Sequence, residues 1–181
     1  MPLLRSLKPR LTREQATARF QGPWKRLVGA LGASPLRAIA DAYVPFRLYE
    51  VSIEADARRK TALYALDAVE GSLDPFEFAT VPGAAELVEV ETRNRPEAAV
   101  DEARGARLLE DKLRRLVYQT GFFRVGRLEF RTRAVASELH VPYWLGLYGS
   151  ERVRSLRVID AVRGRFEGAR ARALFESWLA S

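Results

Sequence analysis

Cysteine is absent from this 181-residue chain, and histidine occurs only once, as His140. Without thiolates the chain has no disulfides, zinc ribbons or iron–sulfur ligation. A single histidine excludes a histidine-based metal cluster and a relay of two histidines. We therefore expect neither a metal ion nor a cofactor.

Long apolar runs are also missing. Residues 1–11 are basic but lack the continuous hydrophobic segment of a secretory signal, and no stretch approaches the ~20 apolar residues that span a bilayer. The expectation is a cytoplasmic protein. Hydrophobic residues make up 48% of the chain and charged residues 29%, a balance typical of folded globular domains rather than disordered chains.

Lysine is scarce, because only four of the 30 basic residues are lysines. The net charge of +7 is unevenly spread: +7 over residues 1–60, −5 over 61–120 and +5 over 121–181. An arginine excess has two readings. It reflects either GC-rich codon usage or selection for planar, bidentate recognition of phosphate or carboxylate groups.

The first 43 residues are expected to form short helices. Thr12 and Gln15 have the spacing of a capping box, which predicts a helix that ends before Gly22. A second helix is predicted over 23–31. A third is predicted over 35–43, with Ser34 as its N-cap.

From Val44 the hydrophobic period changes to two, which predicts strands. Residues 44–54 and 63–69 form a predicted β-hairpin, followed by strands over 73–78 and 87–92. A long amphipathic helix is predicted over 96–120, capped by Asn94. Three further strands and a C-terminal helix are predicted over 125–135, 139–148, 152–162 and 169–179.

Two segments of the chain resemble each other. Val44-Pro45-Phe46 opens the first hairpin and Asp67-Ala68-Val69-Glu70-Gly71 closes it; Val141-Pro142-Tyr143 opens the second and Asp160-Ala161-Val162-Arg163-Gly164 closes it. The second hairpin is shorter by four residues, an even number that preserves the face of each side chain. The pattern indicates an internal duplication, with each aspartate forming a turn.

These patterns predict an α+β fold of two related β-hairpin modules, with a long central helix and a C-terminal helix packed on antiparallel sheet. The expected segments are an N-terminal short-helix region (1–43), a first β module (44–95), and a helix with the second β module and C-terminal helix (96–181). We expect these segments to form one domain.

A candidate surface for binding a partner follows from arginines that alternate along the predicted strands beside aromatic residues. Its members are Arg124, Arg127, Arg131, Arg133, Arg152, Arg154, Arg157, Tyr143 and Trp144. Glu129, in the middle of this row, counts against phosphate binding. The alternative is an ordinary half-solvated sheet with a polar outer face.

No phosphate-binding loop, dinucleotide glycine fingerprint or nucleophile elbow is present. The favoured hypothesis is a non-catalytic interaction or scaffold protein that holds a macromolecular partner, most simply a protein, through its arginine-rich surface. A nucleic-acid-binding protein is the first alternative. The second is an enzyme in which Asp67 and Asp160 converge as paired carboxylates, or in which His140 is a general base. Basic residues in the first 26 positions suit a partner-binding arm better than a membrane anchor.

Overall fold

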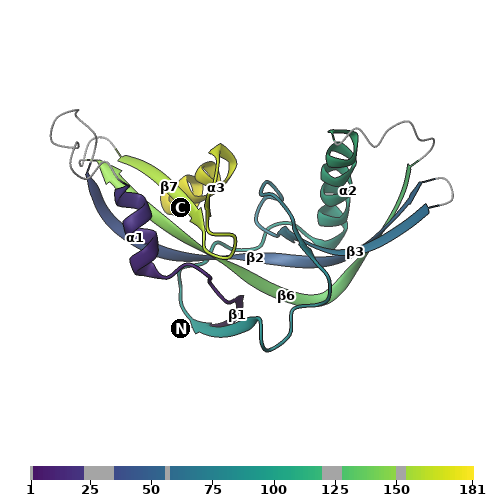
Figure 1. Cartoon of the computed structure of the whole chain (residues 1–181), viewed down its shortest axis with the longest axis horizontal. Coiled ribbons are helices and arrows are strands. Elements are labelled where there is room, and N and C mark those ends of the chain that lie inside the picture. Colours follow the sequence, from purple (N-terminus) through teal and green to yellow (C-terminus); the bar gives the residue numbers. More distant parts are fainter. Residues whose placement is uncertain (1, 23–34, 56–57, 120–127, 150–153) are drawn as a thin grey trace. The chain divides into compact units, whose positions relative to one another are not determined.

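The computed structural model describes residues 2–22, 35–55, 58–119, 128–149 and 154–181. Three helices and eight strands occur within these ranges (Figure 1). Their bounds are β1 Leu3–Leu7, α1 Arg13–Gln21, β2 Leu36–Ala55, β3 Arg58–Asp67, β4 Phe76–Phe78, β5 Leu87–Glu91, α2 Glu102–Gln119, β6 Leu128–Gly149, β7 Arg154–Asp160, β8 Arg165–Phe166 and α3 Ala169–Ala180.

The protein is a mixed α+β chain built on one large, mostly antiparallel sheet. Six strands follow the order β4-β3-β2-β6-β1-β5, while β7 pairs with β6 and β8 pairs with β7. Strand β1 runs parallel to β6, with Ser6 opposite His140. The predicted fold class is thus confirmed at the level of α+β with antiparallel sheet.

The chain divides into two compact units, each assembled from distant segments. Unit 1 comprises Met1–Val44, Val88–Pro96 and His140–Ser181, and unit 2 comprises Pro45–Leu87 and Glu97–Leu139. The long strands β2 and β6 contribute to both units. The units therefore cut across the three consecutive segments that the sequence predicts.

In unit 1, helix α1 covers one face of the β6–β7 hairpin. Thr12 begins the helix with the predicted capping box, because its side chain accepts from the Gln15 amide while the Gln15 side chain accepts from the Thr12 amide. The buried cluster under this helix consists of Leu11, Ala16, Phe20 and Ile159. Helix α3 also packs in this unit, and its Phe175 ring lies 5.4 Å from that of Tyr143.

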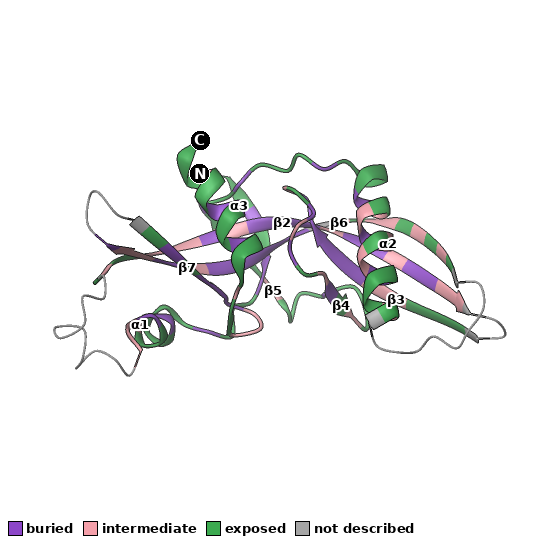
Figure 2. Ribbon diagram, turned by 90° about the horizontal axis from the view of Figure 1, so that it is seen from above, coloured by how far each residue is buried: buried purple, intermediate pink, exposed green. Residues whose placement is uncertain are grey.

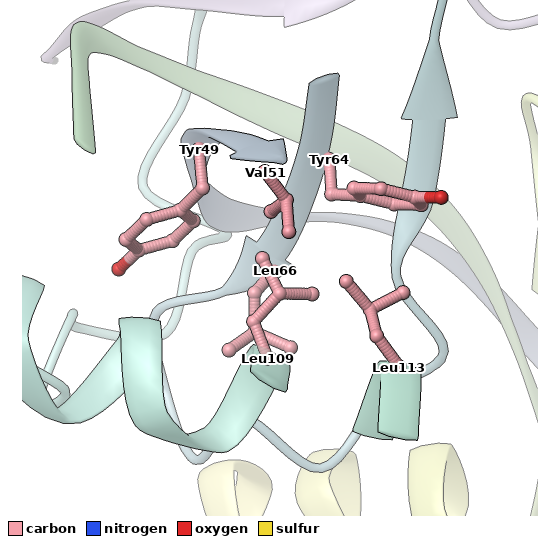
Figure 3. Packing of buried hydrophobic residues seen from close by; sticks show 6 residues of the cluster. All are labelled: Tyr49, Val51, Tyr64, Leu66, Leu109 and Leu113. Carbon is pink, nitrogen blue, oxygen red and sulfur yellow. The ribbon is translucent and has the colours of Figure 1, made fainter. Parts of the chain in front are cut away.

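In unit 2, helix α2 packs on the β2–β3 hairpin. Alternate strand positions send side chains toward the helix, and spacings of three and four along the helix send side chains back. Figure 3 shows the resulting cluster of Tyr49, Val51, Tyr64, Leu66, Leu109 and Leu113. All six side chains are buried, whereas the outer side of α2 is exposed (Figure 2).

The turn after the first hairpin is tied back to the strand that opens it. Phe46 pairs with Asp67, and the Ala68 amide donates to the Pro45 carbonyl at 2.8 Å. Gly71 closes the turn with φ of +69°, a conformation that side chains with a β-carbon rarely adopt.

The turn after the second hairpin repeats this arrangement. Tyr143 pairs with Asp160, and the Ala161 amide donates to the Pro142 carbonyl at 3.0 Å. Gly164 has φ of +67°. The prediction that each proline lies at the start of its strand is wrong, because β2 and β6 both begin upstream of it.

The predicted helix over 35–43 is wrong. Residues 36–43 belong to β2, and the Tyr43 amide donates to the Asn94 carbonyl, 51 positions along the chain. Leu36 and Ile39 pack against the cluster under α1. A tertiary partner thus overrides the local helix signal. The helix predicted over 23–31 lies outside the described residues.

The central helix starts at Glu102, six residues after the predicted start at Pro96. Ala99 and Val100 donate their amides to the Ala68 carbonyl, so their backbone is held in the hairpin turn of unit 2 instead of in a helix. Asp101 is the actual cap, because its Oδ1 accepts from the Arg104 amide at 2.8 Å.

Two strand predictions also need correction. Residues 125–135 and 139–148 are not separate strands, because the described part of this region, from Leu128 onward, is the single strand β6. The short strands β1 and β8 are not predicted by the sequence, since each contains at most five residues and depends on its sheet neighbour. The C-terminal helix agrees with the prediction to within one residue.

Candidate interaction surface

The nine predicted surface residues do not form one described group. Arg124, Arg127 and Arg152 lie outside the described residues, and for Arg154 only its position at the start of β7 is described. Of the other five, two belong to unit 2 and three to unit 1.

The two predicted aromatic members are occupied within unit 1. Tyr143 is only 2% exposed and packs edge-on against Phe175, so it is no longer a candidate for contacting a partner. Trp144 is half-buried, and its indole N–H donates to the Leu11 carbonyl at 2.8 Å. Both rings therefore stabilise the fold.

In unit 2, Arg131 and Arg133 project from the exposed face of β6, as their alternation predicts. Phe130, on the opposite face, packs against the α2 cluster and carries the Arg114 guanidinium 4.9 Å from its ring centroid. Arg133 is paired with Glu50 at 3.1 Å.

The same face of unit 2 carries charges of both signs. Arg59 lies 3.6 Å from Glu54. The next cross-strand pair on this face is Ser52 and Thr61, whose hydroxyl oxygens are 3.0 Å apart. Such exposed ion pairs contribute about 0–1 kcal/mol each. Alternating signs make this face a weak attractor for a polyanion.

Unit 1 contains a different arrangement, in which Arg157 on β7 is stacked on an exposed ring. Its guanidinium carbon lies 4.1 Å above the centroid of Phe166, which is 41% exposed. Phe166 pairs with Ile159 across the β7–β8 ladder, so both lie on the face that carries Arg157. A stacked guanidinium is held in place, and Arg157 also hydrogen-bonds with the Tyr148 side chain, so only the rest of its donors can reach a carboxylate.

A residue of helix α1, Phe20, packs against the Phe166 ring. Phe20 lies edge-on to Phe166 at 5.9 Å and to Tyr148 at 6.4 Å, and the Tyr148 hydroxyl donates to the Phe20 carbonyl at 2.7 Å. Burial raises the pKa of Tyr148, whereas the positive charge of Arg157 acts in the opposite direction. We call Arg19, Phe20, Tyr148, Arg157 and Phe166 the Arg157 cluster.

Sequence reasoning missed Phe166, and it placed Arg19 only among the basic residues of an N-terminal partner-binding arm. Phe166 sits in a two-residue strand, and Arg19 donates to the Gly164 carbonyl, 145 positions away. No local pattern connects α1 with β8. The sequence pointed to this cluster only through Arg157, which is two positions before Ile159 on β7 and therefore on the same face.

Charge is divided unequally between the two units. Within the described ranges, unit 1 holds 14 Lys and Arg residues against 7 Asp and Glu residues, a net +7. Unit 2 holds 11 against 14, a net −3. The excess positive charge of the protein is therefore a property of unit 1.

Both carboxylate oxygens of Asp67 accept hydrogen bonds from backbone amides of the turn that follows the first hairpin. Oδ1 accepts from the amides of Glu70 and Gly71, and Oδ2 accepts from the amide of Leu73, all at 2.8–2.9 Å. The side chain is fully buried. Turn formation accounts for this residue.

Asp160 holds the equivalent position in unit 1. Oδ1 accepts from the amides of Val162 and Arg163, and Oδ2 lies 3.6 Å from the Arg163 guanidinium. Burial raises the pKa of Asp160, and the bonds and charge of Arg163 only partly offset that effect. Asp67 and Asp160 belong to different units, and each is engaged in its own turn.

His140 is 5% exposed, and its Nδ1 lies 3.3 Å from the Arg5 carbonyl of β1. That position is in a strand ladder, where the ring contacts backbone. Across the described residues, no group of three or more histidine, aspartate and glutamate side chains is placed to hold a metal ion.

The basic N-terminal residues fall on β1, α1 and the segment between them. Arg13 donates to the Ile39 carbonyl at 3.2 Å, and Arg19 to Gly164, so two of these side chains attach α1 to unit 1. Arg5, Lys8 and Arg10 are exposed. Lys25 and Arg26 lie outside the described residues.

Comparisons with protein-family models, curated proteins and solved structures find no match to this chain. In the described part of the chain, no helix combines the length and the hydrophobicity that a membrane crossing requires.

Proposed function

We propose that the protein is a non-catalytic binding protein whose basic unit 1 holds an acidic protein partner, with the Arg157 cluster at the contact. The observation that carries the proposal is the net +7 of unit 1 against the net −3 of unit 2. Positive potential on one unit attracts an anionic partner at long range, and Arg157, positioned by Phe166, offers a bidentate contact to carboxylates.

The use of the aromatic side chains favours a protein partner over a nucleic acid. Binding of single strands relies on ring faces that are free to stack on bases. Among the described aromatic residues of unit 1 in the candidate surface and the Arg157 cluster, Tyr143 is buried, Trp144 and Tyr148 are half-buried with their polar atoms bonded to the chain, and Phe166 is stacked under Arg157. A carboxylate needs only the guanidinium edge.

The test measures fluorescence anisotropy of two labelled probes, poly-glutamate and a single-stranded oligonucleotide, at 50 and 200 mM NaCl. Arg157→Glu is compared with Arg131→Glu, an equal charge reversal on the exposed face of unit 2. We expect Arg157→Glu to weaken poly-glutamate binding about three- to tenfold and Arg131→Glu to change it less than twofold.

Three outcomes count against the proposal. Equal losses in the two variants would move the contact away from unit 1. Tighter binding of the oligonucleotide, with an affinity that falls steeply with salt, would favour the nucleic-acid alternative. If neither probe bound at 50 mM NaCl, the basic surface of unit 1 would not be the binding surface.

We also propose that the two hairpins are copies of one ancestral module. The proposal is supported by the two turns, which share an inward aspartate, a following alanine that bonds to the proline carbonyl of the opposite strand, and a glycine at positive φ. An aspartate-glycine turn alone is common. The shared bond to a proline inside a long strand is the more specific feature.

A further inference from the structure

The segment that leads into α1 is bonded to the turn of the second hairpin. The amides of Arg10 and Leu11 both donate to the Ala161 carbonyl, at 2.8 and 3.1 Å. Thr12 follows as the N-cap, with the Gln15 amide bonded to its side chain. Helix α1 therefore starts from a fixed point on the hairpin of unit 1.

The segment that leads into α2 makes the same bonds to the turn of the first hairpin. The amides of Ala99 and Val100 both donate to the Ala68 carbonyl at 2.8 Å. Asp101 follows as the N-cap, with the Arg104 amide bonded to its side chain. One offset of 89 positions relates all four residues of this segment to their counterparts before α1.

A second correspondence lies before these segments. Ser6 of β1 is opposite His140, and the Asn94 carbonyl accepts from the Tyr43 amide. His140 and Tyr43 are equivalent under the offset of 97 that relates the hairpin openings. In both cases the stretch before a helix lies beside the long strand of the other half of the chain.

The hairpin duplication proposed above thus extends to the helices, and from it we infer that the chain is two β-α-β-β repeats that have exchanged their helices. Helix α1 belongs to the first repeat in sequence but packs on the hairpin of the second, while α2 of the second repeat packs on the hairpin of the first. Each compact unit is consequently built from both repeats.

The packing at the two helix–hairpin joints supports this equivalence. In unit 1 a β-carbon on Gly146 would lie 2.7–2.9 Å from the Phe20 ring, so a large helix residue faces a strand glycine. In unit 2 the strand equivalent of Gly146 is Tyr49, and its ring faces the helix glycine Gly105. Under the offset of 89 the counterpart of Gly105 is Ala16, one turn before Phe20, so in each unit a ring from one side of the joint packs close to a glycine on the other side.

The exchange is tested by a crosslink that joins the repeats. In Phe20→Cys/Gly146→Cys the two β-carbons fall within about 4.5 Å, because the Phe20 Cγ is 2.9 Å from the position of a β-carbon at 146. A protease site is placed in the exposed residues 83–86 between β4 and β5. The chain has no other cysteine.

After cleavage of the folded, oxidised protein, we expect one band of full mass on a non-reducing denaturing gel and two bands after reduction. Two bands without reductant would overturn the exchange. The matched control is the cleavable protein without cysteines, which must give two bands under both conditions.

The unsubstituted protein provides a second measurement, in case the cysteine variant does not fold. A nuclear Overhauser cross-peak is expected between the Phe20 ring protons and the Gly146 α-protons, and its absence would overturn the exchange. Neither readout involves a ligand, so failure of the proposed acidic partner leaves this result unaffected.

Discussion

Asp160 is a completely buried carboxyl group, and its surroundings make one contribution to the dependence of stability on pH. The folded state holds the carboxyl proton more tightly than the unfolded chain, because burial raises the pKa of Asp160. The native state therefore binds more protons than the unfolded state in the pH range just above the ordinary pKa of 3.8. Stability from this group declines as pH rises through the folded pKa.

Asp160→Asn should remove this dependence. An asparagine retains the oxygen that accepts from Val162 and Arg163 but has no proton to lose. We expect the free energy of unfolding of the wild type, relative to the variant, to fall as pH rises above about 4 toward neutrality. Urea unfolding between pH 4 and pH 7 measures it, with the exposed Glu89→Gln as control. A pH-independent difference would show that Asp160 titrates normally.

Among the elements, the joint between α2 and the first hairpin depends on a close approach of helix and strand. Gly105 lies one turn into α2, where the Tyr49 hydroxyl donates to the Glu102 carbonyl at 3.3 Å. A β-carbon at position 105 would overlap that hydroxyl oxygen and lie 3.1 Å from Cζ. Glycine costs a helix up to about 1 kcal/mol relative to alanine, so it is retained here for space.

Gly105→Ala should therefore cost more stability in the wild type than in a background without the Tyr49 hydroxyl. In the wild type we expect a loss of about 1–3 kcal/mol, because the overlap exceeds the gain in helix propensity. In Tyr49→Phe the obstructing oxygen is gone, and the same substitution should cost at least about 1 kcal/mol less. Denaturant unfolding of the four proteins measures the coupling. Gly83→Ala, which meets no atom within 4 Å, is the control; additive effects would contradict the packing.

Secondary-structure elements are predicted correctly where the residues that define them bond to neighbours in the sequence. The capping box at Thr12 places α1 correctly, since both bonds form within four residues. Residues 36–43 carry helix spacing yet form strand, since Tyr43 bonds to Asn94. The start of α2 fails for the same reason, because Ala68 holds the preceding segment.

At the scale of the whole molecule, charge follows the folded units and not the two consecutive halves of the sequence. The sequence up to residue 86 carries 12 basic and 10 acidic residues, and the remainder carries 18 and 13, so both halves are positive. Unit 1 nevertheless has a net +7 and unit 2 a net −3 within the described ranges. Each unit draws residues from both halves of the chain, so the positive charge of unit 1 comes from both halves.

This concentration of like charge predicts that salt stabilises the protein. Raising NaCl from 20 to 300 mM shortens the Debye length from roughly 20 Å to about 6 Å and screens the repulsion within unit 1. We expect the melting temperature, followed by circular dichroism, to rise by a few degrees. Arg10→Glu/Arg95→Glu, two exposed positions of unit 1, should reduce that rise. A decrease with salt would mean that ion pairs outweigh repulsion.

The candidate site was only partly visible in the sequence. Arg131, Arg133 and Arg157 are exposed as their alternation on strands predicts. Tyr143 has the same alternation signal but is buried under Phe175, because strand period gives the face of a residue and not what covers that face. Phe166 could not be found, since its position depends on pairing with β7.

The sequence by itself determined the alternating strands, the aspartate turns, the cap of α1 and the α+β class, all of which depend on bonds or periodicities within a few residues. Tertiary structure decided which hairpin each helix covers. That choice rests on contacts such as the Trp144 bond to the Leu11 carbonyl, 133 positions apart, and on the fit of Phe20 against Gly146. A linear pattern does not specify such partners, because burial is determined by the folded chain as a whole.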